Sequence, residues 1–136
     1  LSAPCGETTL ADALMAPTEI YNKPLLALQR EIKPHALVHI TGGGLLENIP
    51  RVLPNGCSAV LDKQTWELPP VFQWLATAGG VAEEEMHRTF NCGIGMTVIV
   101  GPSKAEAALQ LLSDQGLKCW ELGTIAEGNG IVEFTS

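Results

Sequence analysis

Three consecutive glycines stand at positions 42–44 of this chain, between a short apolar segment and a segment with helical character. Glycine has no Cβ, so the triplet permits positive φ angles and lets a ligand approach the backbone closely. Amides that open the following segment would point at an anion, and a helix dipole would favour negative charge there. The loop therefore predicts an anion site, with phosphate as the natural ligand.

Polar side chains around the triplet favour the same prediction. Thr41 offers a hydroxyl, His39 an imidazole, Asn48 an amide and Arg51 a guanidinium. The spacing matches neither the phosphate loop of nucleotide hydrolases nor the dinucleotide fingerprint, so the loop alone is not diagnostic. Three alternatives stay open: the glycines form only a tight turn, Arg51 is solvated, and His39 is a core histidine at a strand end.

Composition restricts the class of protein further. With 136 residues, of which 46% are hydrophobic, the chain is long enough to bury the core of one ordinary domain without disulfides. No window approaches the roughly 20 apolar residues of a membrane-spanning helix. The net charge of −7 opposes non-specific binding to nucleic acid or to an anionic membrane. We therefore expect neither as a partner.

The cysteines and the N-terminus bear on the compartment. Four cysteines, at positions 5, 57, 92 and 119, show no zinc spacing, so we expect free thiols, no metal site and a cytoplasmic protein. Cys92 is interpreted as a buried structural residue, with a nucleophilic role as the alternative. The chain does not begin with methionine and shows no secretory signal, so we expect it to be part of something longer.

Hydrophobic periodicity and the placement of proline and glycine predict the elements. Helices are expected over residues 8–15, 20–32, 69–78 and 104–115, with another opening at residues 83–85. Strands are expected over residues 35–40, 58–62, 95–100, 118–126 and 131–134. Thr8 would cap the first helix, and Ser103 with Glu106 would form a capping box on the last. We expect residues 1–136 to form one α+β domain with a mixed or antiparallel sheet.

Two long segments carry a resemblance to a known family. Residues 39–51 (HITGGGLLENIPR) and 85–96 (EMHRTFNCGIGM) resemble signatures of the C-terminal domain of aminoimidazole ribonucleotide synthetase, also called phosphoribosylformylglycinamidine cyclo-ligase. Residues 17–21 (PTEIY) resemble that family's Pro-Thr-Arg-Ile-Tyr segment, with Glu19 replacing the usual arginine. If that arginine contacts an anion in relatives, the contact is lost here; otherwise it is a surface or pairing residue. The similarity covers nearly the whole chain.

The resemblance implies a role in de novo purine synthesis. The family uses ATP, accompanied by Mg2+, to activate the formyl amide oxygen of formylglycinamidine ribonucleotide as a phosphoryl imidate. An amidine nitrogen then closes the imidazole ring and expels phosphate, which gives aminoimidazole ribonucleotide. Two domains of each subunit form the cleft, and the enzyme is a homodimer.

For the fold, the resemblance implies an α+β domain of three α/β/α layers with a mixed, mainly antiparallel sheet, partly ferredoxin-like. The family's N-terminal domain carries most contacts to ATP and metal, and its segments are absent from this sequence. We therefore expect residues 1–136 to be the C-terminal half of a two-domain enzyme, inactive without the other half.

The resemblance also implies a site for substrate or phosphate, although it assigns no catalytic residue. The residues implied are His39, Thr41, Gly42, Gly43, Gly44, Asn48, Arg51, Arg88, Thr89 and Asn91. Those of the second segment would line the side that faces the glycine loop. Arg88 has an alternative, pairing with the preceding glutamates on a helix surface. Gly93 and Gly95 serve either close strand packing or the approach of a ligand.

Two other interpretations of the function remain open. The first is another enzyme of the same superfamily, which includes formylglycinamidine ribonucleotide synthetase, selenophosphate synthetase, thiamine-monophosphate kinase and a hydrogenase maturation factor. The second is a non-catalytic module that binds phosphate or assists assembly. An activity assay separates the enzymes, and ligand titration tests the module.

Overall fold

The computed structural model of the protein describes residues 1–135, which form six α-helices and seven short strands. The helices are α1 Leu10–Leu14, α2 Asn22–Glu31, α3 Gly44–Asn48, α4 Pro70–Gly79, α5 Glu83–Thr89 and α6 Ala105–Asp114. The strands are β1 Pro4–Cys5, β2 Thr8–Thr9, β3 Ala36–His39, β4 Cys57–Asp62, β5 Met96–Ile99, β6 Gly123–Glu127 and β7 Val132–Thr135. Short 3-10 turns cover Ile49–Val52, Lys63–Thr65 and Pro102–Lys104.

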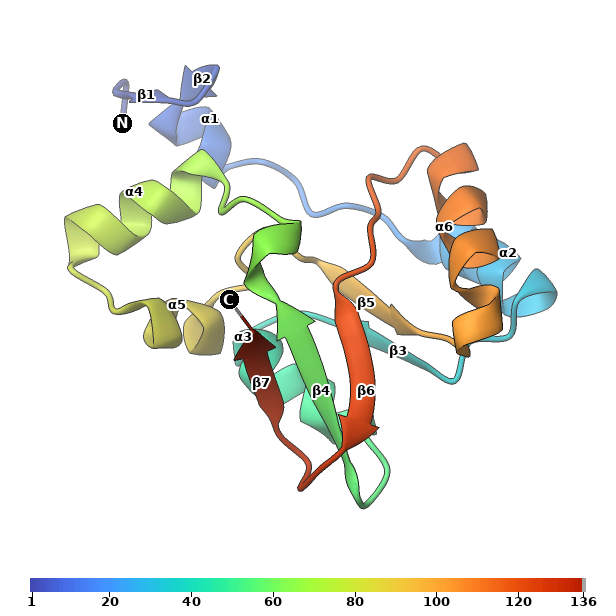
Figure 1. Cartoon of the computed structure of the whole chain (residues 1–136). Coiled ribbons are helices and arrows are strands. Elements are labelled where there is room, and N and C mark those ends of the chain that lie inside the picture. Colours follow the sequence, from blue (N-terminus) through green and yellow to red (C-terminus); the bar gives the residue numbers. More distant parts are fainter. Residues whose placement is uncertain (136) are drawn as a thin grey trace.

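The strands form three small sheets (Figure 1). β1 and β2 pair antiparallel, as do β3 and β5. The third sheet has the order β6-β4-β7, in which β4 is antiparallel to β6 and parallel to β7. The expected mixed, mainly antiparallel pairing is therefore present, but it is divided among separate sheets.

The sheet of β3 and β5 lies between two hydrophobic clusters. On one face, Val38 and Ile40 pack with Ala59 and Leu61 of the third sheet. On the other face, Val98 packs against the cluster that α2 and α6 build, whose centre is the fully buried Leu28. Alternate residues of a strand point to opposite faces, so β3 reaches the first cluster through Val38 and β5 reaches the second through Val98.

Helices α2 and α6 lie side by side at one end of the molecule, whereas α1, α4 and α5 lie at the other (Figure 1). The spacing of apolar residues at positions 21, 25, 28 and 32 predicts an apolar stripe for α2. Leu25, Leu28 and Ile32 do face the cluster shared with α6, whereas Tyr21 precedes α2 and contacts His39 instead. Pro24 stands in the first turn of α2, where its missing N–H leaves no helical bond unmade. α4 begins at Pro70 and ends before Gly80, which adopts a left-handed conformation, as the sequence predicts.

Several expectations about element ends were wrong. Thr9, and not Thr8, caps α1, because Thr8 and Thr9 form a strand that pairs with β1. Ser103 lies inside a 3-10 turn that begins at Pro102, so it forms no capping box, and Lys104 is the N-cap of α6. β6 starts only at Gly123, so most of the strand predicted from residue 118 is irregular. In residues 1–135 no helix combines the length and apolarity needed to cross a membrane.

Candidate functional site

The glycine loop connects β3 to α3 and has the predicted order of strand, glycine turn and helix. Gly43 has a φ of 98° and Gly44 a φ of 56°, values that favour glycine. The N–H of Gly44 donates to the carbonyl of Thr41 at 2.9 Å and closes the turn. α3 is only five residues long. Its dipole is correspondingly small, so attraction for an anion must come mainly from the loop amides and nearby side chains.

Asn48 holds the loop from inside. Its side chain is 3% exposed, and its Nδ2 donates to the carbonyls of Thr41, Gly42 and Gly44 at 3.3, 3.2 and 2.8 Å. These bonds occupy the amide nitrogen that sequence reasoning assigned to a phosphate. In this structure Asn48 therefore positions the loop rather than presenting a free donor.

This arrangement also sets the direction of the loop amides. The peptide bonds of the described residues are all trans, so the carbonyl of one residue and the N–H of the next point in opposite directions. Because the carbonyls of Thr41 and Gly42 turn toward Asn48, the N–H groups of Gly42 and Gly43 turn away from it. Within residues 1–135 neither N–H donates to a backbone carbonyl. Two adjacent amides are thus available to an anion on the outer side of the loop.

The second predicted segment meets the loop at the end of α5. A Cβ on Gly44 would lie 2.0 Å from the carbonyl oxygen of His87 and 2.7 Å from that of Phe90, so only glycine fits there. The N–H of Ile40 also donates to the carbonyl of Gly95 at 2.9 Å. The structure therefore brings together the backbones of residues 39–51 and 85–96.

The polar side chains of that second segment point to other partners. Arg88 is exposed and donates from Nη2 to Glu84 at 3.0 Å and from Nε to Glu85 at 3.1 Å, the helix-surface pairing that the sequence left as an alternative. Both carboxylates raise the pKa of Arg88. The Oδ1 of Asn91 accepts from the N–H of Gly93 at 3.0 Å, whereas Thr89 is exposed. An anionic ligand must compete with the two glutamates for Arg88, whereas the contact of Asn91 uses only its amide oxygen.

Three titratable residues flank the loop in the sequence, and a contact with the loop is seen for one of them, Glu47. Arg51 is exposed in the 3-10 turn that follows α3, and His39 is exposed at the end of β3. Glu47 lies beside the loop, because a Cβ on Gly43 would come within 2.8 Å of its Oε2. A carboxylate at this position opposes a bound anion. Sequence reasoning missed Glu47, although its place three residues after the triplet puts it on the first turn of α3.

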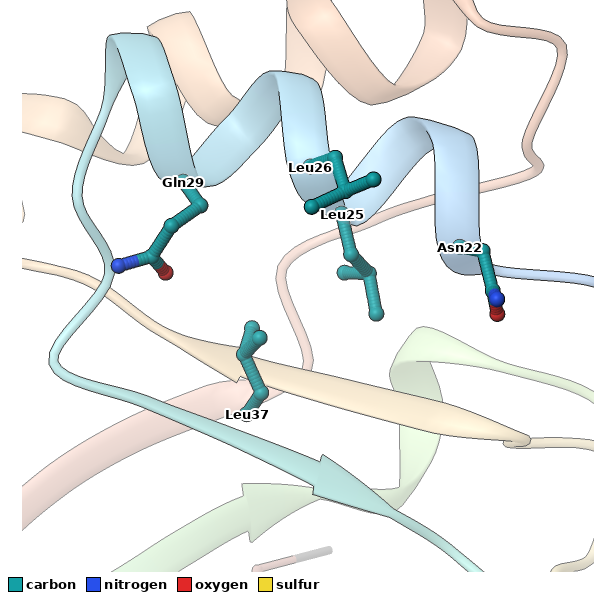
Figure 2. A pocket seen from close by; sticks show the side chains of 5 residues that line it. All are labelled: Asn22, Leu25, Leu26, Gln29 and Leu37. Atoms are coloured by element: carbon teal, nitrogen blue, oxygen red, sulfur yellow. The ribbon is translucent and has the colours of Figure 1, made fainter.

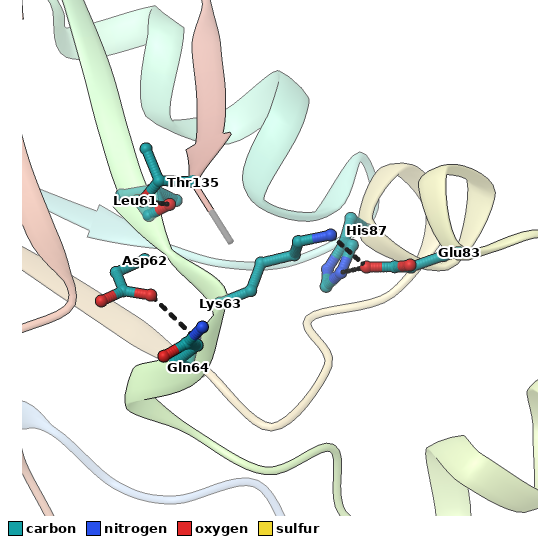
Figure 3. Close-up of polar contacts among 7 residues, drawn as sticks. All are labelled: Leu61, Asp62, Lys63, Gln64, Glu83, His87 and Thr135. Carbon is teal, nitrogen blue, oxygen red and sulfur yellow. Dashed lines mark hydrogen bonds and ion pairs between the residues drawn. The ribbon is translucent and has the colours of Figure 1, made fainter.

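A hollow lined by residues of α3, α5 and β7 and by Lys63 gathers a second group of polar side chains. Lys63 donates to Glu83 at 2.7 Å, and the Nε2 of His87 lies 3.9 Å from the same carboxylate (Figure 3). Burial lowers the pKa of His87, an effect that the carboxylate of Glu83 partly opposes, and the hydrogen bond from Lys63 lowers the pKa of Glu83. The ring of His87 packs on Phe134, with centroids 4.7 Å apart. A neutral, packed imidazole is a structural element here.

A further groove runs between α2 and β3 and is mostly apolar. Figure 2 shows the side chains that line it: Asn22, Leu25, Leu26, Gln29 and Leu37. None of them belongs to the predicted site.

The buried thiol of Cys92 agrees with its structural interpretation. The side chain is fully buried, its Sγ donates to the carbonyl of Met86 at 3.4 Å, and burial raises its pKa to about 11. A thiol in this state is a weak nucleophile. The glycine that follows it, Gly93, packs closely on Pro69, with a φ of 91°.

Comparison with known proteins identifies relatives of the chain. Residues 2–135 match the model of the family described as AIR synthase related protein, C-terminal domain. The phosphoribosylformylglycinamidine cyclo-ligase of Nitrosospira multiformis is 58% identical over 127 residues, covering 93% of this chain and 36% of that protein. The protein of the same name from Burkholderia mallei is 59% identical over 125 residues, covering 92% of this chain and 36% of the relative. The chain thus spans little more than a third of these relatives.

Proposed function

Because the chain belongs to the AIR synthase related protein family, whose C-terminal domain it matches, we propose that it is part of an ATP-dependent phosphoribosylformylglycinamidine cyclo-ligase. Such an enzyme converts formylglycinamidine ribonucleotide to aminoimidazole ribonucleotide in de novo purine synthesis. In this proposal the glycine loop binds a phosphate of the substrate or of the nucleotide. Support comes from the two outward amides of Gly42 and Gly43, which Asn48 orients.

The proposal divides the chemistry between two domains. Residues 1–135 contain no group of three His, Cys, Asp or Glu side chains placed to hold a metal ion. As the resemblance to the cyclo-ligase family implies, we assign Mg2+ and most ATP contacts to an N-terminal domain of the complete enzyme, which we propose to be a cytoplasmic homodimer. The proposal extends to a three-layer, partly ferredoxin-like fold, of which α2 and α6 on one face of the sheet of β3 and β5 would form one helical layer, whereas the other face of that sheet packs on the third sheet.

A chimeric enzyme tests the function directly. In the Nitrosospira multiformis cyclo-ligase, the region that matches this chain, which is 58% identical, would be replaced by this chain. The N-terminal part of the relative would be kept. We expect ATP-dependent formation of aminoimidazole ribonucleotide, measured with the intact relative as the control. A chimera that folds and binds ATP but forms no product contradicts the proposal, and activity on substrates of the related synthetases and kinases would favour those enzymes instead.

Two substitutions of opposite charge test the phosphate site. We expect Arg51→Ala to weaken the binding of inorganic phosphate by about 1.5–3 kcal/mol, because a charge-assisted hydrogen bond is lost. Glu47→Gln should strengthen it, since it removes the carboxylate that lies beside Gly43. Calorimetric titration of the chain measures both. Equal affinities in the two variants and the parent chain would show that Arg51 is only solvated, and a parent chain that binds no phosphate would show that the loop is only a turn.

A further inference from the structure

Tyr21 stands at the point where α2 begins and contacts His39, although the two residues come from different elements. Their ring centroids are 6.1 Å apart and the ring planes meet at 72°, an edge-to-face arrangement. Tyr21 is half-buried, whereas His39 is exposed. The ring of Tyr21 is therefore the better-packed partner, and it limits the orientations of the exposed His39 imidazole.

Gly95 determines the position of the Tyr21 ring. A Cβ on Gly95 would lie 2.1 Å from the phenol oxygen of Tyr21 and 3.1 Å from Cζ. Gly95 is not among the glycines with positive φ, so space rather than backbone conformation requires glycine here. Of the two uses that the sequence left open for Gly95, the structure shows close packing, and the packed atom is the Tyr21 hydroxyl.

The same glycine lies at the entrance to the loop. Its carbonyl accepts from the N–H of Ile40, the residue between His39 and Thr41. Tyr21 therefore packs on the backbone at the place where β3 becomes the glycine loop. Burial, and secondly the carboxylate of Glu19, raise the pKa of Tyr21, so the phenol keeps its proton at neutral pH.

We propose that Tyr21 and Gly95 form a positioning pair that holds the His39 imidazole at the mouth of the glycine loop, where it reaches the phosphate bound there. The proposal rests on the proposed function for the identity of that ligand. The positioning itself rests on the packing of Tyr21 between His39 and Gly95. Tyr21 acts through His39 and is not a catalytic residue.

Four variants of the chain test the pair by steric conflict and rescue. Gly95→Ala introduces a methyl group that collides with the Tyr21 hydroxyl and displaces the ring. Tyr21→Phe removes that oxygen and leaves Cζ at 3.1 Å as the nearest ring atom, a conflict that a small ring shift relieves. The double variant should therefore restore the packing. Gly101→Ala, at the other end of β5, is the control, because its Cβ meets only His35 Nε2 at 3.6 Å.

Imidazole NMR signals report the position of His39 without any ligand. We expect Gly95→Ala to move the His39 signal toward that of an unstructured histidine, and the double variant to return it. Gly101→Ala should move only the signal of His35. If Gly95→Ala prevents folding, Tyr21→Leu replaces it, since it removes the ring without crowding Gly95. A His39 signal that neither Gly95→Ala nor Tyr21→Leu moves, or that the double variant fails to restore, overturns the proposal.

Kinetics of the chimeric enzyme separate this proposal from the function. We expect Gly95→Ala to raise the KM for formylglycinamidine ribonucleotide about tenfold with a smaller change in the KM for ATP, and the double variant to reverse the effect. If the chimera is active and Gly95→Ala does not change its KM values, the positioning pair is refuted and the proposed function still holds. An inactive chimera in which the His39 signal shifts and recovers as expected refutes the function and leaves the positioning pair intact.

Discussion

Asn48 shapes the glycine loop as much as the glycines do, because one amide nitrogen reaches three carbonyls. We expect Asn48→Ala to lower the free energy of unfolding by about 2–3 kcal/mol, since it leaves a buried cavity and carbonyls without a donor. Urea denaturation measures the change. Phosphate binding should weaken as well, because the outward amides lose their orientation.

Asn55→Ala serves as the matched control for this substitution. Asn55 is exposed in the turn before β4, so its loss should change stability by less than about 0.5 kcal/mol. If both variants unfold like the parent chain, Asn48 does not hold the loop.

His87 makes stability depend on pH. Its pKa in the folded protein is below the ordinary value of 6.5, chiefly because the side chain is buried. The unfolded chain therefore binds the proton first as the pH falls, and the free energy of unfolding drops through this range. We expect lower stability at about pH 5.5 than at about pH 7.5, measured by urea denaturation. Glu83, whose pKa is lowered from 4.5, acts only at more acidic pH.

His87→Gln tests the assignment, because glutamine has no titrating group. The stability of this variant should change less between the two pH values than that of the parent chain. An unchanged difference would assign the pH dependence to another residue.

Single residues also show why the site could be predicted only in part. The sequence correctly predicts that Asn48 and Arg88 donate hydrogen bonds. It does not say which acceptors they reach. A buried carbonyl and a phosphate oxygen are the same kind of acceptor, so Asn48 suits both. Tyr21 entered only as an apolar helix position and as part of a resemblance, because its contacts with His39 and Gly95 join residues that are distant in the sequence.

Among the elements, α3 and α5 depend on one close contact. We expect Gly44→Ala to lower the free energy of unfolding by about 3 kcal/mol or more, because the methyl group meets backbone oxygens of α5 that cannot move alone. Thermal and urea denaturation measure the change. The left-handed φ of Gly44 adds strain for alanine.

Gly42→Ala is the control within the same loop. A Cβ on Gly42 meets no atom within 4 Å, and Gly42 is not among the residues with positive φ. The free energy of unfolding of the Gly42→Ala variant should stay within about 0.5 kcal/mol of that of the parent chain. A similar loss in both variants would place the strain in the loop as a whole, not in the contact with α5.

Elements with strong local signals were predicted, and those set by pairing were not. Pro70 and Gly80 bracket α4 because each imposes a backbone conformation that the neighbours cannot override. Ser103 failed as a cap because Pro102 starts a 3-10 turn one residue earlier. The strands β1 and β2, each two residues long, exist only through each other, so no local pattern predicts them.

The whole molecule rests on two hydrophobic clusters that share one sheet. Leu45 is fully buried in the first cluster and Leu28 in the second. We expect Leu45→Ala and Leu28→Ala each to lower the free energy of unfolding by about 2–5 kcal/mol. Because β3 and β5 join the clusters, both variants should unfold in a single transition.

Two probes check that the clusters unfold together. Two of the three tryptophans, Trp66 and Trp120, pack against the first cluster, so tryptophan fluorescence reports mainly that cluster, whereas far-UV circular dichroism also reports α2 and α6. The two unfolding curves should coincide in each variant. Separate transitions in Leu28→Ala would show that α2 and α6 form an independent unit.

The order of strands in the third sheet has a consequence for how the protein is made. β4 lies in the centre, and both its neighbours, β6 and β7, come from the last residues of the chain. During synthesis, the apolar residues of β4 therefore leave the ribosome long before either partner exists. Closing such distant pairings slows folding, because chain entropy is lost before contacts form. The nascent chain thus passes through a period in which an unpaired central strand is open to aggregation.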